Sequence, residues 1–212
     1  MKIALIGATG FIGSAILKEA LARGHQVTAL VGHPEKLAPA AKLTAIGTDV
    51  LDETRLAGQL EGHEAVISAF SGHAQDDVYG YYMQGIRAII GATRRAGVAR
   101  LLVVGGAGSL EAAPGLLVID TPGFPSQWKG TAQGALDALN LLKQESALNW
   151  TMLSPSAMIA PGERTGKFRL GADQLLVNAN GESAISVEDY AAAMMDELEK
   201  PAHARQRFTV GY

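Results

Sequence analysis

The sequence contains no cysteine in its 212 residues. That absence excludes disulfide bonds, thiolate catalysis and cysteine-based zinc or iron–sulfur sites, and it fits the reducing cytoplasm. Charge is also sparse: Asp, Glu, Lys and Arg make up 18% of the chain, and the net charge is −3. Without a basic excess, nothing in the sequence predicts binding to nucleic acid or to an anionic membrane. We expect a cytoplasmic protein, monomeric or homodimeric, whose partner is a small molecule.

Long apolar runs are missing as well. The longest, Leu101 to Gly108, is far shorter than the roughly 20 residues of a transmembrane helix. The apolar start at Met1–Ile6 ends at Gly7, too soon for a signal peptide, and predicts a strand. Hydrophobic residues nevertheless make up 48% of the chain, which favours one domain, residues 1–212, with a single large core.

Short apolar runs alternate with segments of helical periodicity. The runs lack polar alternation, as is typical of strands buried on both faces of a parallel sheet. They are Ile3–Ile6, Gln26–Val31, Leu43–Ile46, Ala65–Ser68, Leu101–Val104 and Trp150–Leu153. Helices are predicted over residues 11–23, 52–60, 79–96, 130–146 and 187–200. This alternation predicts an α/β fold with a doubly wound parallel sheet, the Rossmann fold.

The last quarter of the chain has a different pattern. Leu175–Val177 and Ser183–Ile185 read as short strands on either side of an Asn-Gly turn, and Arg207–Val210 reads as a final strand. Residues 154–212 are too few for a second domain. We expect them to form a small C-terminal cap on the substrate side, together with the final strand.

The strongest motif is Gly-Ala-Thr-Gly-Phe-Ile-Gly at residues 7–13, between the first strand and the first helix. There, Gly7 allows a tight turn, Gly10 lets a pyrophosphate approach, and Gly13 lets the helix pack on the strand. The helix N-terminus offers free N–H groups to the phosphates. The predicted contacts of a dinucleotide are Gly7, Thr9, Gly10, Phe11, Ile12 and Gly13.

The end of the second strand bears on the choice of dinucleotide. NAD-binding proteins usually carry Asp or Glu there to bond the ribose, whereas this chain has Gly32-His33, with Lys36 shortly after. His33 and Lys36 could attract a 2′-phosphate, or they could be a solvated histidine and a surface lysine. This position favours NADP over NAD.

Other strand ends should line the same crevice, because ligands bind outside the carboxyl ends of parallel strands. Asp49 is placed to bond the adenine, and Pro155 to wall the nicotinamide. The full set of further cofactor contacts expected here is Asp49, Val50, Ala69, Phe70, Ser71, Gly105, Gly106, Ser154 and Pro155.

Several segments resemble one family. G-A-T-G-F-I-G, V-I-S-A-F, L-L-V-V-G-G-A-G-S-L, S-P-S-A-M-I-A-P-G-E-R-T-G and I-S-V-E-D-Y-A are similar to the atypical short-chain dehydrogenase/reductases. Within them the match is to small NAD(P)H-binding proteins described as NADH-flavin reductases, related to NmrA-like and biliverdin reductase B-type proteins. The resemblance runs from Lys2 to Tyr212. It implies a Rossmann fold and a nicotinamide cofactor.

The proton-donating pair of carbonyl-reducing relatives is absent, since no tyrosine has a lysine four residues later. Trp128 stands where similar proteins often have tyrosine. A flavin needs less from the protein, because the isoalloxazine accepts hydride itself. We expect an NAD(P)H-dependent reductase of FMN, FAD or another flat conjugated acceptor, with Ser109, Trp128 and Lys129 in the acceptor pocket. The alternative is a non-catalytic NAD(P)-binding redox sensor acting through a protein partner. The five histidines lack metal-ligand spacing, so no metal is expected.

Overall fold

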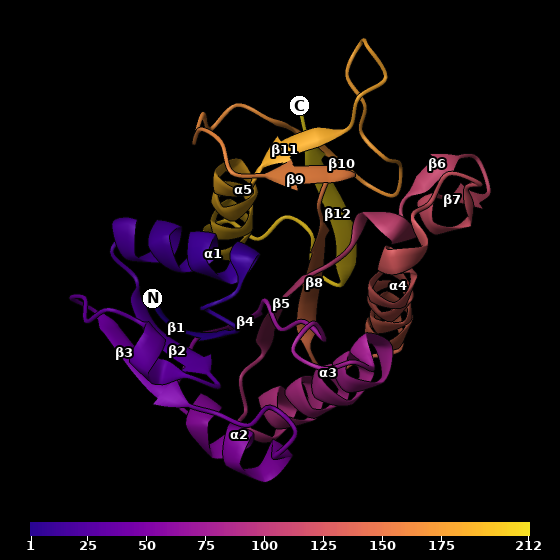
Figure 1. The fold of residues 1–212 in the computed structure, drawn as a ribbon. Helices are drawn as coiled ribbons and strands as arrows, with labels where there is room; N and C mark the ends of the chain where they lie inside the picture. The colour runs from indigo at the N-terminus through magenta and orange to yellow at the C-terminus, as the bar shows by residue number, and fades with distance from the viewer.

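Eight strands form the central sheet, in the order β10–β12–β8–β5–β4–β1–β2–β3 (Figure 1). The structure is a computed structural model and describes residues 1–212. Every neighbouring pair is parallel except β10 with β12. The strands are β1 (Lys2–Ile6), β2 (Gln26–Val31), β3 (Leu43–Gly47), β4 (Ala65–Ser68), β5 (Arg100–Val104), β8 (Asn149–Ser154), β10 (Arg169–Gly171) and β12 (Gln206–Gly211).

Helices cover both faces of this sheet (Figure 1). One face carries α1 (Phe11–Ala22) and α5 (Val187–Glu199), and the other carries α2 (Glu53–Leu60), α3 (Val78–Arg95) and α4 (Lys129–Lys143). Each face has its own apolar core. Ile16 and Met194 belong to the first core, whereas Leu56, Ile86 and Leu139 belong to the second. None of the helices has the length and apolar character needed to cross a membrane.

The predicted fold class is confirmed: this is an α/β protein with a doubly wound, mostly parallel sheet. All six strands predicted before residue 154 are present, and the five predicted helices begin and end within a few residues of their expected limits. The strand order reverses between β1 and β4, which are neighbours although β2 and β3 lie between them in sequence. A ligand crevice is expected at the carboxyl ends of these two strands.

The prediction for Leu175–Val177 is wrong. These residues form no strand, although a tight turn follows them, in which the Gly181 N–H donates to the Asn178 carbonyl at 3.0 Å. The strand β11 (Ala184–Ser186) pairs instead with β9 (Met158–Ala160), in parallel. Residues 175–177 and 183–185 are therefore joined by a turn but do not pair with each other as a hairpin.

The expected cap occupies only part of residues 154–212. Strands β9 and β11 lie above the carboxyl ends of the main sheet (Figure 1), while α5 packs against α1 and β12 enters the sheet beside β8. A small antiparallel hairpin, β6 (Glu111–Ala113) with β7 (Leu116–Leu117), follows β5. We call the chain from β9 to β11, residues 158–186, the cap segment.

Candidate functional site

The loop between β1 and α1 closes tightly over the reversal point of the sheet. Gly7 has φ +81°, and its N–H donates to the carbonyl of Leu30 at 3.0 Å. A Cβ at this position would lie 2.6 Å from the carbonyl oxygen of Ala69, which follows β4. Gly7 therefore brings the ends of β1 and β4 together, as the predicted tight turn requires.

Gly10 differs from Gly7 and Gly13 in what surrounds it. Its φ is −75°, and an added Cβ would meet no atom closer than the Gly7 carbonyl oxygen at 3.4 Å. The fold itself therefore tolerates a side chain there, and the residue is exposed. A glycine that the fold does not require leaves open space beside the helix N-terminus for another molecule.

The first turn of α1 is prepared for an anion. Its N-cap residue, Gly10, has no side chain to accept a hydrogen bond, and no acidic residue occupies the first turn. By contrast, α2, α3 and α5 are capped by Asp52, Asp77 and Ser186, whereas α4, which follows a short 3₁₀ helix, also has no side-chain cap. Uncapped N–H groups at the positive end of a 12-residue helix attract a phosphate. Thr9, Gly10 and Phe11 are exposed at this end, with Ile12 partly buried behind them.

The end of β2 contains a carboxylate that was not among the residues predicted from the sequence. The Glu35 carboxylate lies 3.0 Å from Nδ1 of His33, and both side chains are about two-thirds exposed (68% and 67%). A hydrogen bond from the Glu35 backbone N–H lowers the pKa of this carboxyl group, and the hydrogen bond to His33 lowers it by a smaller amount. Lys36 is exposed nearby. The Glu35 carboxylate therefore partly offsets the positive charge expected at this loop. The end of β2 is sterically open, because a Cβ on Gly32 would meet no atom within 4 Å.

The residues after β3 and β4 are placed more unevenly. Asp49 is exposed, and its Oδ1 accepts a hydrogen bond from the Leu51 N–H at 3.0 Å, while Val50 is buried. After β4, Ser71 is exposed, and Ala69 and Phe70 are partly buried. The structure thus leaves the Asp49 carboxylate and the Ser71 region open to a ligand and turns Val50 into the core.

The ends of β5 and β8 are governed by packing. A Cβ on Gly105 would lie 2.8 Å from Cγ of Met152, and one on Gly106 would lie 2.9 Å from Cβ of Ala135 on α4. Ser154 and Pro155 are buried. These glycines let a loop approach the neighbouring strand and helix, so packing alone accounts for their small size.

Ser109 does not face an open acceptor pocket, contrary to expectation. It ends a short 3₁₀ helix (Ala107–Ser109) and is only 2% exposed. Its hydroxyl donates to the Gly106 carbonyl at 3.0 Å and accepts from Nη1 of Arg207 at 3.3 Å. Because both of these bonds point into the protein, the hydroxyl is held as a structural group.

Trp128 and Lys129 lie at the N-terminus of α4. Trp128 is 50% exposed, and its ring packs against that of His73 in a T-shaped arrangement with the centroids 6.0 Å apart. Lys129 lines a separate cleft of about 430 Å³ with Tyr79 and Asp120. The Trp128 ring is thus exposed at the surface, whereas Lys129 lies in the cleft next to Tyr79 of α3.

The pKa of the hydroxyl is raised in three tyrosines, Tyr79, Tyr82 and Tyr190. Tyr79 donates to Asp137 at 2.9 Å, and this bond raises the pKa of its hydroxyl. Burial raises the pKa of both Tyr82 and Tyr190. An acid–base tyrosine of a reductase needs the opposite shift. No group of three His, Asp or Glu side chains is arranged to hold a metal ion.

The profile of the NAD(P)H-binding family matches residues 7–201. The chain belongs to this family. The match begins at Gly7, the first glycine of the loop above, and reaches beyond α5. The resemblance to atypical short-chain dehydrogenase/reductases is thereby confirmed.

Three relatives of this NAD(P)H-binding protein span almost its entire length. The uncharacterised protein YwnB of Bacillus subtilis is 43% identical over 99% of this chain and 98% of its own. A Bacteroides thetaiotaomicron structure, provisionally described as an epimerase, is 46% identical, covers 100% of this chain and 96% of its own, and has a TM-score of 0.93. A Streptococcus pneumoniae structure, provisionally described as an NADH-flavin reductase, is 36% identical, covers 100% and 99%, and has a TM-score of 0.85.

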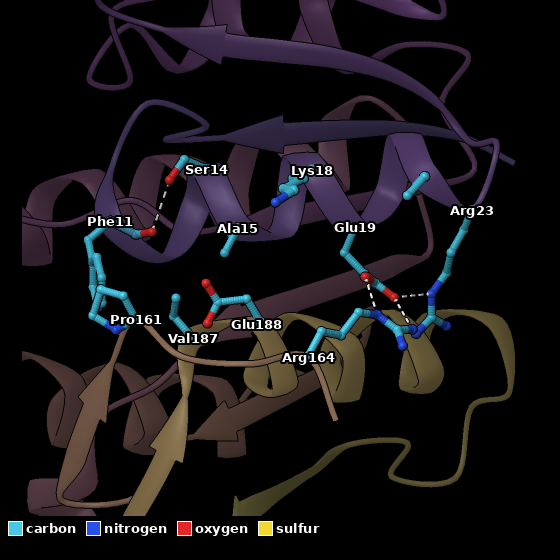
Figure 2. A pocket seen from close by; sticks show the side chains of 11 residues that line it. Phe11, Ser14, Ala15, Lys18, Glu19, Arg23, Pro161, Arg164, Val187 and Glu188 are labelled. Atoms are coloured by element: carbon cyan, nitrogen blue, oxygen red, sulfur yellow. Dashed lines mark hydrogen bonds and ion pairs between the residues drawn. The ribbon is translucent and has the colours of Figure 1, made fainter. Parts of the chain in front are cut away.

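The G-E-R-T-G segment of this NAD(P)H-binding protein is a clamped loop between α1 and α5. Arg164 donates to the Glu19 carboxylate at 2.6 and 2.7 Å, and Gly166 donates its N–H to Asp189 at 2.8 Å. The loop borders a cleft of about 610 Å³ along α1, with Phe11 and Pro161 at one end and the Glu19–Arg164 pair at the other (Figure 2). The motif therefore fixes the cap segment to α1, close to the glycine loop at residues 7–13.

Proposed function

We propose that this protein is an NAD(P)H-dependent reductase that passes hydride to a flavin or another flat conjugated acceptor. The main support for nucleotide binding comes from the surroundings of Gly10. A glycine that the fold does not require stands beside the uncapped N-terminus of α1 at the reversal point of the sheet. This combination supports a pyrophosphate lying against α1, as family membership also favours.

The residues around the crevice support a flat apolar acceptor. Phe11, Trp128 and Met158 are 51%, 50% and 66% exposed, and they begin or precede α1, α4 and β9. All three elements start beyond the carboxyl ends of main-sheet strands, where the acceptor has to meet the cofactor. Exposed apolar side chains at one edge are typical of a binding surface for an apolar ligand.

The raised pKa values of the tyrosine hydroxyls favour a flavin over a carbonyl compound as the hydride acceptor. Carbonyl reduction requires a proton donor of suitable pKa, whereas the pKa of Tyr79, Tyr82 and Tyr190 is raised. When bound, the nicotinamide supplies the hydride, and a flavin can accept it without a protein acid. The protein then has to bind two rings face to face and exclude water. For the nicotinamide cofactor we propose NADP, with NAD as a weaker alternative, because of His33 and Lys36.

The test is a direct reductase assay. Protein is mixed with NADPH or NADH and with FMN, and the absorbance of the reduced nicotinamide is followed against a protein-free control. The Gly10→Val variant is the matched control, because the added side chain should occupy the pyrophosphate space. We expect FMN-dependent oxidation by the wild type and little by this variant. Tight NADPH binding without reduction of FMN or a quinone would instead support the redox-sensor alternative.

A further inference from the structure

Arg207 on β12 carries a guanidinium that the protein almost completely covers. Its side chain is 4% exposed. Nη1 donates to the carbonyl and hydroxyl oxygens of Ser109 at 3.4 and 3.3 Å and to the Ser154 hydroxyl at 3.4 Å. Nε donates to Oδ1 of Asp173 at 2.9 Å, and Nη2 donates to the same oxygen. One buried cation thus joins four separate parts of the chain.

Ser109 and Ser154 lie at the carboxyl-end side of the sheet, and Asp173 follows β10, which runs antiparallel to β12. Ser109 is in the loop after β5, Ser154 ends β8, and Asp173 belongs to the cap segment, just after β10. Two backbone hydrogen bonds reinforce the last connection: the Glu111 N–H donates to the Asp173 carbonyl at 2.8 Å, and the Leu175 N–H donates to the Glu111 carbonyl at 2.9 Å. The cap segment is therefore attached to the chain that follows β5.

The charge of Arg207 has a single counter-ion. Asp173 is the only carboxylate within ion-pair distance, and its side chain is 57% exposed. A buried charge without a partner is strongly unfavourable. If residues 173–175 moved away from the sheet, Arg207 would stay buried under Ser109 and Ser154 and would lose Asp173. The ion pair consequently favours the position in which the cap segment lies against the ends of β5 and β8.

We propose that Arg207 and Asp173 are positioning residues that hold the cap segment over the acceptor side of the crevice. They set the space between the cap segment and the loops after β5 and β8, and thereby the affinity for the acceptor. They act through Ser109 and Ser154 and not on the reacting atoms. The inference rests on the proposed function, since it assigns this end of the crevice to the acceptor.

The experiment compares Asp173→Asn, Arg207→Lys and Arg207→Met with the wild type and with Arg169→Met. Arg169 is a matched control, because it also ties the cap segment, through the carbonyls of Val177 and Tyr212, but does not reach Ser109 or Ser154. Three quantities are measured: hydrogen exchange of the Glu111 and Leu175 amides, the Kd for NADPH, and kcat and KM with FMN.

The expected pattern separates positioning from general stability. In Asp173→Asn, the two amides should exchange about tenfold faster, and KM for FMN should rise about five- to tenfold with kcat and the NADPH Kd within about twofold. Arg207→Met should raise KM for FMN further, since Ser109 and Ser154 also lose their donor. Arg207→Lys should restore part of the loss, because it keeps the charge without the fork of donors. Arg169→Met should leave both amides and KM unchanged.

Several outcomes would overturn the inference. Wild-type exchange and KM in both Asp173→Asn and Arg207→Lys would do so, and so would an equal rise of KM in Arg169→Met. If Arg207→Met does not fold, the Asp173→Asn and Arg207→Lys results still decide. A wild type that binds NADPH and reduces no acceptor would contradict the proposed function. Amide exchange would then decide separately whether the ion pair holds the cap segment.

Discussion

Gly10 and Gly13 lie three residues apart, but only Gly13 is required by the packing of the fold. A Cβ on Gly13 would be 2.0 Å from the Gly7 carbonyl oxygen, whereas one on Gly10 would be 3.4 Å from the same atom. Two glycines of one motif therefore serve different ends. Gly13 allows α1 to approach the loop, and Gly10 leaves room on the outer side for a ligand.

This difference predicts opposite effects of one added methyl group. The melting temperature of Gly10→Ala should lie within a few degrees of that of the wild type. Its affinity for the cofactor should fall at least about tenfold, because the added methyl group would occupy the space proposed for the pyrophosphate. Gly13→Ala should lower the free energy of unfolding by about 1–3 kcal/mol, since the atoms overlap. Thermal melts and fluorescence titration with NADPH measure both. Normal NADPH binding by a folded Gly10→Ala and Gly10→Val would show that the loop has been misassigned.

A second prediction concerns the choice between NADPH and NADH. Glu35 places a carboxylate 3.0 Å from His33, where it would repel a 2′-phosphate. Glu35→Gln should therefore raise the preference for NADPH about threefold, while His33→Ala with Lys36→Ala should weaken NADPH selectively, by roughly tenfold. Lys143→Ala, an exposed lysine at the far end of α4, is the charge control. Equal losses for both cofactors would remove His33 and Lys36 from the phosphate site.

The main sheet could be predicted from the sequence because its signals are local. Buried strands such as Ile3–Ile6 are continuous apolar runs, and Ser186 caps α5 by accepting from the Asp189 N–H at 3.0 Å, as expected. The strands β9 and β11 have three residues each, too few for a periodic pattern. Their pairing depends on tertiary contacts, so a turn signal alone led to the wrong partner.

The candidate site was predictable only where the backbone determines it. The glycine loop at residues 7–13 follows from strand, turn and helix, all read from residues 1–23. The position of Ser109 depends on Arg207, which lies 98 residues further along the chain. Nothing near Ser109 in sequence signals that a buried guanidinium will bind it. Glu35 has a local signal, because it lies in the sequence between His33 and Lys36.

A third prediction concerns acid stability through Glu19. Hydrogen bonds from Arg164, and then from Arg23, lower the pKa of the Glu19 carboxyl below its usual value of 4.5, against the effect of burial. A carboxyl group whose pKa is lower in the folded state stabilises the protein at pH values above its pKa in the unfolded state. This contribution disappears as the pH falls through the pKa of the folded state. Glu19→Gln should therefore cost about 2 kcal/mol at pH 7.

The pH dependence of that cost is the diagnostic part. The difference in free energy of unfolding between wild type and Glu19→Gln should be constant above about pH 5.5 and should shrink steadily below 4.5. Glu163→Gln is the control, since Glu163 is exposed in the same loop and its side chain makes no hydrogen bond or ion pair. Urea unfolding at a series of pH values measures both. A difference that does not change with pH would mean that packing, not charge, makes Glu19 important.

A fourth prediction separates binding from chemistry at Lys129. The side chain lines the cleft with Tyr79 and Asp120 and does not belong to a Tyr-x-x-x-Lys pair. Lys129→Ala should raise KM for an anionic acceptor such as FMN about two- to fivefold and leave kcat nearly unchanged. A neutral quinone is the matched acceptor, and its KM should not respond. A loss of kcat with both acceptors would instead place Lys129 at the reacting atoms.

Trp128 provides the last prediction, because it stands where similar proteins often have tyrosine. Its ring is half exposed and can stack on a flat acceptor, but an indole is no proton donor for the reaction. Trp128→Phe should keep most FMN reduction, since stacking is retained. Trp128→Tyr should not raise turnover by the roughly 10²–10⁴-fold typical of a gained general acid. Steady-state kinetics with FMN and with a carbonyl substrate measure both. A large rise of kcat in Trp128→Tyr with the carbonyl compound would contradict flavin reduction and indicate a latent carbonyl reductase.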